Sequence, residues 1–243
     1  MKIVLSDATY LRDSIGVISE LVNEASFKVT KNGLELVAMD PANVAMVIFK
    51  LLPSCFSEFE ATEESVAINL TNLKQVLKRS TAADILSLET VENTLQIGIK
   101  GKSQKSFSLP IIDIEEKEHK IPNLSFPVSV EIDSSALNEA VDDSAIVGES
   151  VAFIAAPGKF VVSAEGDLSK ASVDITDAKV TSETKANIKS KYSIEYLKKM
   201  LAGAKIATTA TVQFNQDYPL RLDYLLKDKV SISFILAPRV END

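Results

Sequence analysis

The twelve residues SFKVTKNGLELV, at positions 26–37, consist of two short alternating segments on either side of Asn32-Gly33. Apolar and polar side chains alternate before and after this pair, as they do in strands with one buried face. An Asn-Gly pair between two such runs is the strongest short-range signal of a β-hairpin. The stretch therefore predicts antiparallel sheet close to the start of the chain.

A second turn of this kind occurs in the other half of the chain, at Pro157-Gly158 between residues 151–155 and 160–164. Gly33 and Gly158 are 125 positions apart. Repeats at a fixed spacing indicate a repeated structural unit. We therefore expect two copies of a fold of about 120 residues, within the usual size range of a domain.

The second helix of each copy has the same spacing, because Val76 and Met200 are 124 positions apart. Apolar side chains at helical spacing predict helices at residues 8–22, around Leu73, Val76 and Leu77, at residues 134–147, and around Leu197, Met200 and Leu201. Asp7 precedes the first as a candidate N-cap. The expected strands are residues 26–30, 34–37, 44–52, 66–70, 85–90, 94–100 and 106–112 in the first copy, and residues 128–132, 151–155, 160–164, 171–175, 186–188, 209–214, 220–226 and 230–236 in the second. This order predicts an α+β fold with antiparallel sheets and helices on one face.

The boundary between the copies is a charged segment broken by a proline, residues 113–127. We interpret it as an extended connector. The expected organisation is an N-terminal domain at 1–112, this interdomain connector, and a C-terminal domain at 128–243.

Composition places the chain among ordinary globular proteins, with 243 residues, 46% hydrophobic, 25% charged and a formal charge of −8. No run approaches the roughly 20 apolar residues of a membrane helix, and the start is too short for a signal peptide. A single cysteine, Cys55, permits no intrachain disulfide and fits a reducing compartment. We expect an intracellular protein.

Three segments carry a resemblance to a known family: LVAMD at 36–40 followed by Val44, Ile121-Pro122, and LAPRV at 236–240. In a duplicated α+β chain, they make it similar to the archaeal–eukaryotic DNA sliding clamp, the proliferating cell nuclear antigen family. The resemblance implies a trimeric ring of duplicated clamp domains, with sheets outside and two helices per domain facing a central hole. It implies a processivity factor that encircles duplex DNA and tethers polymerase and other replication and repair proteins.

The resemblance also implies partners and a location. The partners are double-stranded DNA contacted without sequence preference, a clamp loader, and DNA polymerase, flap endonuclease and ligase bound through short hydrophobic motifs. The ring is either a homotrimer or a heterotrimer with related subunits. The expected location is cytoplasm or nucleoid in an archaeon and the nucleus in a eukaryote, with no membrane partner and no cofactor.

Such a ring requires helices that are more positive than the rest of the chain. In chain order, the four predicted helices carry net charges of −1, +3, −3 and +2. Taken together, they are more positive than the rest of the chain. The implied DNA-facing residues are Arg12, Lys74, Lys78, Arg79, Lys198, Lys199 and Lys205. Charge alone favours a solvated helix face with no ligand, and the resemblance reverses this preference. The acidic third helix departs from expectation: either it lies back from the phosphates or the ring contains non-identical subunits.

The resemblance implies an apolar groove for client motifs that insert one helical turn. Its residues are Met39, Val44, Met46, Ile121, Pro122, Phe126, Pro219, Ile235, Ala237 and Pro238. The alternative for Met39, Val44 and Met46 is ordinary core.

The resemblance further implies that residues 106–112 pair with residues 172–181 of a neighbouring subunit. The interface residues are Ser106, Phe107, Leu109, Ile111, Val173, Ile175, Ala178 and Val180. The alternative is two internal strands of a monomer.

No set of residues predicts catalysis. The only histidine, His119, lies in the connector, and neither a CxxC pair nor a Gly-rich phosphate loop is present. Glu115, Glu116 and Glu118 resemble a solvated charge run more than a metal site, and Cys55 is expected in the core. We predict no enzyme, no catalytic residue and no metal. The alternatives are a clamp-fold interaction scaffold or checkpoint-type clamp and, more remotely, a hydrolase with scattered carboxylates.

Overall fold

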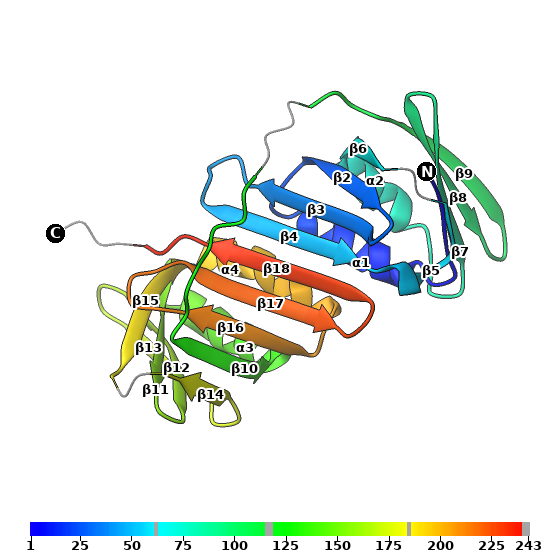
Figure 1. The fold of residues 1–243 in the computed structure, drawn as a ribbon. Helices are drawn as coiled ribbons and strands as arrows, with labels where there is room; N and C mark the ends of the chain where they lie inside the picture. The colour runs from blue at the N-terminus through cyan, green and yellow to red at the C-terminus, as the bar shows by residue number, and fades with distance from the viewer. Residues whose placement is uncertain (61–62, 115–118, 184–185, 240–243) are drawn as a thin grey trace. The chain divides into compact units, whose positions relative to one another are not determined.

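The structure is a computed structural model and describes residues 1–60, 63–114, 119–183 and 186–239 (Figure 1). Its contacts divide the chain into two compact units. Unit 1 comprises Met1–Pro41, Val47–Ile121 and Leu226–Ile232, and unit 2 comprises Ala42–Met46, Pro122–Leu225 and Ser233–Asp243. Glu115, Glu116 and Glu118 lie outside the described residues.

The first copy of the fold contains two antiparallel groups of strands and two helices. The strand orders are β5-β1-β7-β8-β9 and β4-β3-β2-β6. In chain order the elements are β1 (Lys2–Leu5), α1 (Thr9–Ile18), β2 (Glu24–Thr30), β3 (Gly33–Met39), β4 (Ala45–Leu51), the 3₁₀ turn η1 (Pro53–Cys55), β5 (Phe56–Glu60), β6 (Glu64–Asn69), α2 (Leu70–Leu77), β7 (Ile85–Val91), β8 (Thr94–Lys100) and β9 (Gln104–Pro110).

The second copy repeats this topology strand for strand. Its orders are β14-β10-β16-β17-β18 and β13-β12-β11-β15. Its elements are β10 (Val128–Asp133), α3 (Ser134–Ala145), β11 (Ser150–Ala156), β12 (Lys159–Glu165), β13 (Lys170–Asp174), β14 (Lys179–Ser182), β15 (Ile188–Ser193), α4 (Ile194–Leu201), the 3₁₀ turn η2 (Ala202–Lys205), β16 (Thr209–Phe214), β17 (Leu220–Leu226) and β18 (Val230–Leu236). The predicted duplication and α+β class are confirmed.

The two glycine turns have the same role in different surroundings. Gly33 has φ +116° and Gly158 φ +71°, backbone regions that glycine adopts most readily. A Cβ on Gly33 would overlap the carbonyl oxygen of Leu51, whereas a Cβ on Gly158 would meet no atom within 4 Å. The first hairpin is therefore packed against its neighbours at a point where the second is open.

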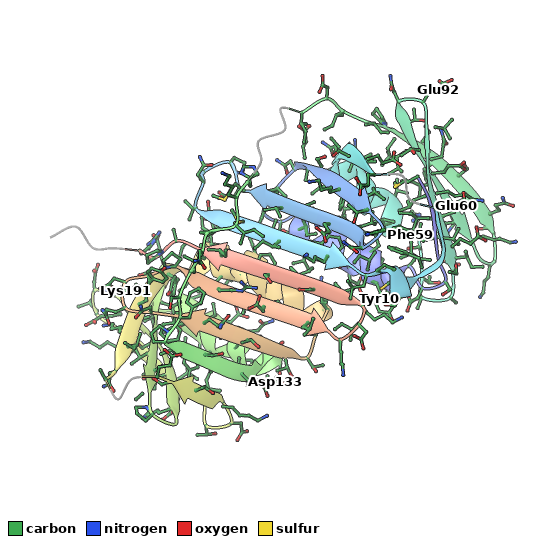
Figure 2. The ribbon with its side chains drawn as sticks, viewed as in Figure 1. Tyr10, Phe59, Glu60, Glu92, Asp133 and Lys191 are labelled. Atoms are coloured by element: carbon green, nitrogen blue, oxygen red, sulfur yellow. The ribbon has the colours of Figure 1, made fainter. Side chains whose placement is uncertain are left out.

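Aspartates precede the first helix of each copy. The Asp7 carboxylate accepts a hydrogen bond from the Thr9 amide at 2.8 Å, although the N-cap residue of α1 is Ala8. Asp133 is the N-cap of α3, and its carboxylate accepts from the amides of Ser135 and Ala136 at 2.8 and 3.2 Å (Figure 2). Both aspartates satisfy amides that a helix leaves unpaired at its start.

Several predicted elements differ from the structure. Strands β1, β5 and β14 were not predicted, because they are short and each contains charged residues. The strand expected at 186–188 is instead Ile188–Ser193, where Ser190 and Tyr192 are buried between exposed or half-buried lysines. Residues 172–181 do not form one strand: β13 belongs to the smaller sheet, while β14 pairs with β10.

None of the helices in the described part of the chain is both long and apolar enough to cross a membrane.

Candidate functional site

The predicted DNA-facing residues lie on or next to two packed helix pairs, α1 with α2 and α3 with α4. An ion pair links the second helix of each pair to the first helix or to the turn directly after it. Lys74 Nζ on α2 lies 2.6 Å from a Glu20 carboxylate oxygen, and Lys198 Nζ on α4 lies 2.8 Å from one of Asp142. These two lysines are 124 positions apart and are equivalent in the two copies, whereas their acidic partners are not: Glu20 lies in the turn after α1 and Asp142 lies within α3.

The remaining cations divide into paired and unpaired groups. Arg12 bonds the neighbouring Asp13 carboxylate at 2.8 Å, and Lys199 lies 2.8 Å from Glu195. The side chains of three others form no ion pair with any residue that the structure describes: Lys78, Arg79 and Lys205. These three are exposed and follow the last turns of α2 and α4. Cations are favoured there, near the negative ends of the helix dipoles.

The acidic residues of α3 are exposed, as their sequence pattern indicates. Glu139 and Asp143 form no ion pair with the described residues, whereas Asp142 pairs with Lys198. Part of the negative charge of α3 is therefore neutralised by a lysine of α4.

The C-terminal tail carries part of the predicted groove. The Ala237 amide donates to the carbonyl oxygen of Val44 at 3.0 Å, so these two groove residues lie side by side in unit 2. Ala237 is exposed and Pro238 half-buried, while Ile235 is only 7% exposed. Main-chain bonding thus places an apolar strip of the tail at the surface beside residues 42–46.

The end of the connector and the loop before β17 contribute the next residues. The rings of Phe126 and Tyr218 are 6.0 Å apart and nearly perpendicular. Phe126 and Pro219 are half-buried and Pro122 is exposed. Sequence reasoning missed Tyr218; its place directly before Pro219, in a loop, is the signal that could have identified it.

Three groove residues behave differently. Met46 is 7% exposed, as the alternative core interpretation requires. Met39 is half-buried and Ile121 is 48% exposed, and both belong to unit 1.

Among the described residues, two of the predicted interface segments include strands at the edge of a sheet. β9 ends the order of the larger sheet in unit 1, and β13 begins the order of the smaller sheet in unit 2. Phe107, Leu109 and Val173 are half-buried, and Ser106 is exposed. Ile111, Ala178 and Val180 are half-buried but lie outside both strands, and Ile175 is buried at 8%. Unpaired edges normally need covering.

No catalytic arrangement is assembled among the described residues. They contain no group of three His, Cys, Asp or Glu side chains that could hold a metal ion. Cys55 is 5% exposed, as predicted for a core residue, and burial raises the pKa of its thiol. A buried, protonated thiol is a poor nucleophile.

Comparisons with known proteins agree with this geometry in both copies. Residues 1–119 match the model of the N-terminal domain of proliferating cell nuclear antigen, and residues 120–239 match that of its C-terminal domain. The chain belongs to the proliferating cell nuclear antigen family. This family consists of sliding clamps and not of enzymes.

Full-length relatives support the assignment. DNA polymerase sliding clamps of Nanoarchaeum equitans and Pyrococcus furiosus are 35% and 36% identical, over 98% and 99% of this chain and 99% and 98% of theirs. The crystal structure of the clamp protein PCNA from Thermococcus kodakaraensis matches with a TM-score of 0.92 at 31% identity, over 98% of this chain and 99% of that one. A chain of the PCNA2–PCNA3 complex from Sulfolobus tokodaii matches with a TM-score of 0.89 at 26% identity, over 99% and 100%.

Proposed function

We infer that this chain works as a DNA polymerase sliding clamp, a ring subunit that encircles duplex DNA and tethers the polymerase to it. The observation that carries this function is that both copies of the fold match the family, over nearly the full length of chain and relatives. The processivity of a polymerase on primed circular DNA, with a clamp loader, tests it. Long products that depend on this chain are expected; products no longer than those of polymerase alone would contradict it.

The DNA-facing surface in this proposal is the set of exposed cations on the helix pairs. Unpaired lysines and arginines can meet phosphates without reading bases, which suits a protein that must slide. Lys78, Arg79 and Lys205 are the strongest candidates, since Lys74 and Lys198 are already held by acids.

The DNA contacts are tested by the salt dependence of clamp retention on circular duplex DNA. The double variant Lys78→Ala/Arg79→Ala should flatten the slope of log affinity against log salt by roughly 0.9 for each phosphate that it no longer neutralises. Lys74→Ala, in the last turn of α2 directly before them, is the control, and its effect should be smaller. Equal effects of the two variants would contradict this ranking.

The client site in this proposal is the groove around Val44, Phe126, Pro219, Ala237 and Pro238. DNA polymerase, flap endonuclease and ligase would each insert a short hydrophobic motif into this groove as one helical turn. Main-chain bonding between Ala237 and Val44 and the half-buried Phe126 support a ready-formed apolar surface.

Three subunits would close the ring by pairing β9 of one with β13 of the next, a head-to-tail contact. Light scattering over a range of concentrations tests it: a mass near three times 26.4 kDa indicates a homotrimer. A stable monomer or dimer would require related partner subunits, as in the two-protein complex from Sulfolobus tokodaii. Leu109→Glu on β9 should reduce the mass to that of the monomer, whereas Leu225→Glu, exposed on β17, should not.

The alternative is a clamp-fold scaffold or checkpoint-type clamp that binds proteins without serving the replicative polymerase. Failure to be retained on circular DNA, with client peptides still bound, would favour it.

A further inference from the structure

The solvent-facing side of the sheet β13-β12-β11-β15 contains a hollow of about 170 Å³. Its floor is made of small side chains that the strand register places in one row: Ala152 on β11 lies opposite Ser163 on β12, which lies opposite Ser172 on β13. Lys191 on β15 lies opposite Ala152 and closes one end of the row. The floor is shallow and presents hydroxyl groups.

Positive charge surrounds this floor. Among the residues that the structure describes, Lys170, Lys189 and Lys191 line the hollow together with one acid, Glu165. Lys170 forms an ion pair with Glu165, and this bond, together with the charges of Lys191 and Lys189 from across the sheet, lowers the pKa of that carboxyl. The hollow therefore holds three ammonium groups and one carboxylate, in a chain whose total charge is −8. We name these residues the basic hollow.

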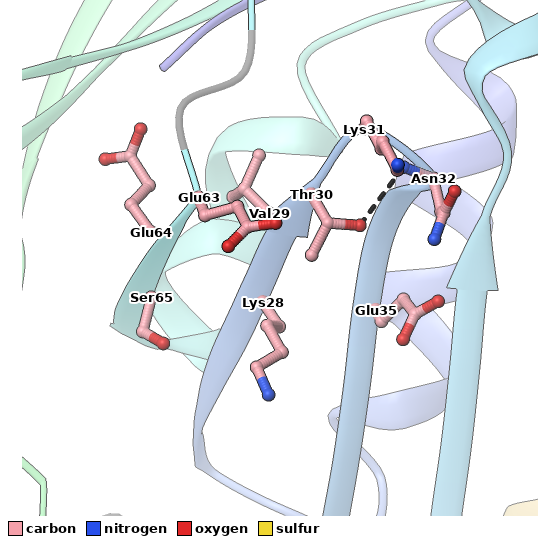
Figure 3. A pocket seen from close by; sticks show the side chains of 9 residues that line it. All are labelled: Lys28, Val29, Thr30, Lys31, Asn32, Glu35, Glu63, Glu64 and Ser65. Atoms are coloured by element: carbon pink, nitrogen blue, oxygen red, sulfur yellow. Dashed lines mark hydrogen bonds between the residues drawn. The ribbon is translucent and has the colours of Figure 1, made fainter.

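The corresponding sheet in the first copy has the opposite balance. A larger hollow of about 530 Å³ lies there over β2, β3 and β6 (Figure 3). It is lined by two lysines, Lys28 and Lys31, and by three acids, Glu35, Glu63 and Glu64. The shared fold therefore does not require a positive surface at the basic hollow.

The strand that carries Lys189 and Lys191 also borders the client groove. The Arg239 amide, directly after Pro238, donates to the Lys191 carbonyl oxygen at 2.7 Å. On the loop side, the Asp217 amide donates to the Lys189 carbonyl oxygen at 3.4 Å, next to Tyr218 and Pro219. Residues of a client that lie a few positions from its hydrophobic motif could therefore reach the basic hollow.

We propose that the basic hollow binds a short acidic stretch of a client polypeptide, next to the hydrophobic motif held in the groove. Carboxylates would meet the ammonium groups and the serine hydroxyls of the floor. An acidic peptide fits better than DNA, because by strand alternation these side chains point away from the face that packs on α3. This inference rests on the proposed clamp function for the groove motif, and the experiment separates the two.

The test uses the full chain and three fluorescent peptides: a hydrophobic client motif alone, and the same motif with six glutamates added before or after it. Fluorescence anisotropy gives their dissociation constants at low salt and in 0.5 M NaCl. At low salt one of the extended peptides should bind about tenfold more tightly than the motif alone. Most of this gain should disappear in 0.5 M NaCl, because exposed charge pairs are screened.

The double variant Lys189→Gln/Lys191→Gln should abolish the gain while the motif alone binds as before. Lys28→Gln/Lys31→Gln, on the corresponding sheet of the first copy, is the matched control and should retain it. No gain from either extension, with the motif still bound, overturns the basic hollow and leaves the clamp function intact. Absence of motif binding overturns the groove and, with it, this inference.

A single-stranded oligonucleotide of six thymidines serves as a competitor. If it displaces the extension at lower concentration than hexaglutamate does, and this depends on Lys189 and Lys191, the hollow is a nucleic-acid site and the proposal is wrong.

Discussion

The two copies of the fold have the same strand order, the same helix pairing and the same inter-helix lysine, yet they differ in their turns, their buried tyrosines and their surface charge. Gly33 is crowded where Gly158 is open, and the hollow on the first small sheet is acidic where that on the second is basic. Topology depends on apolar alternation and turn chemistry, which both copies retain. A change of charge on a solvated face has little effect on stability. The charge of each face can therefore differ between the copies according to the partner that binds there.

The largest expected difference between the copies is at the hairpin glycines. Gly33→Ala should destabilise the protein by about 3 kcal/mol, because an L-residue is strained at this φ and its Cβ would overlap the Leu51 carbonyl oxygen. Gly158→Ala has only the backbone strain and should cost about 1 kcal/mol. The midpoints of guanidinium unfolding measure both changes. Equal shifts would mean that the crowding at Gly33 relaxes without cost.

The second difference concerns buried tyrosines. Tyr192 and Tyr224 are fully buried in the second copy, and burial raises the pKa of both, so their hydroxyls stay protonated. Tyr192 donates to the Tyr218 carbonyl oxygen at 2.8 Å, whereas the Tyr224 hydroxyl has no hydrogen-bond partner among the described residues.

Replacement by phenylalanine should therefore distinguish the two tyrosines. Tyr192→Phe should lower the free energy of unfolding by about 1 kcal/mol, while Tyr224→Phe should be neutral or slightly stabilising. Thermal unfolding of the two variants, compared side by side, gives the answer. A larger loss from Tyr224→Phe would show that its hydroxyl has a partner after all.

A smaller effect is expected at the ion pairs of Lys74 with Glu20 and of Lys198 with Asp142. Lys74→Ala and Lys198→Ala should each change the free energy of unfolding by about 0.5 kcal/mol or less, since their partners are exposed to water. The double-mutant cycles Lys74→Ala with Glu20→Ala, and Lys198→Ala with Asp142→Ala, isolate the pair energies. Because both acids are exposed to water, small values are expected in both copies, and a coupling well above about 1 kcal/mol in either copy would contradict this.

The smallest effect should appear as a pH dependence. Hydrogen bonds from the Ser135 hydroxyl and from the amides of Ala136 and Ser135 lower the pKa of Asp133 below its usual 3.8. Its stabilisation of α3 is therefore present above that value and is lost as pH falls through the lower folded-state pKa. Asp133→Ala should differ from the parent in unfolding at pH 7 and converge with it in strong acid. A difference that persists at pH 2 would argue against a charge-dependent cap.

Much of the fold could be predicted, because the apolar–polar alternation of strands such as β16, β17 and β18 gives their first and last residues correctly. β15 was misplaced because its outward residues are Lys189 and Lys191, which leaves too few apolar positions to mark a strand. The ion pairs Lys74–Glu20 and Lys198–Asp142 could not be predicted, since each depends on how two helices pack. The part of the groove formed by Ala237 and Val44 was predicted from the family resemblance, but the hydrogen bond between them joins residues 193 positions apart and no local pattern encodes it.

The division of the chain into units has a consequence for how the protein is made. Unit 1 includes Leu226–Ile232, where the Lys229 ammonium donates to the Ser54 carbonyl oxygen at 2.7 Å and the Lys229 carbonyl oxygen accepts from the Leu52 amide at 2.9 Å. A ribosome must therefore synthesise almost the entire polypeptide before the first-made half has all of its contacts. Until residues 226–232 are synthesised, the first half of the chain lacks part of its packing surface. A chaperone that protects this surface should therefore release the chain only when it is nearly complete.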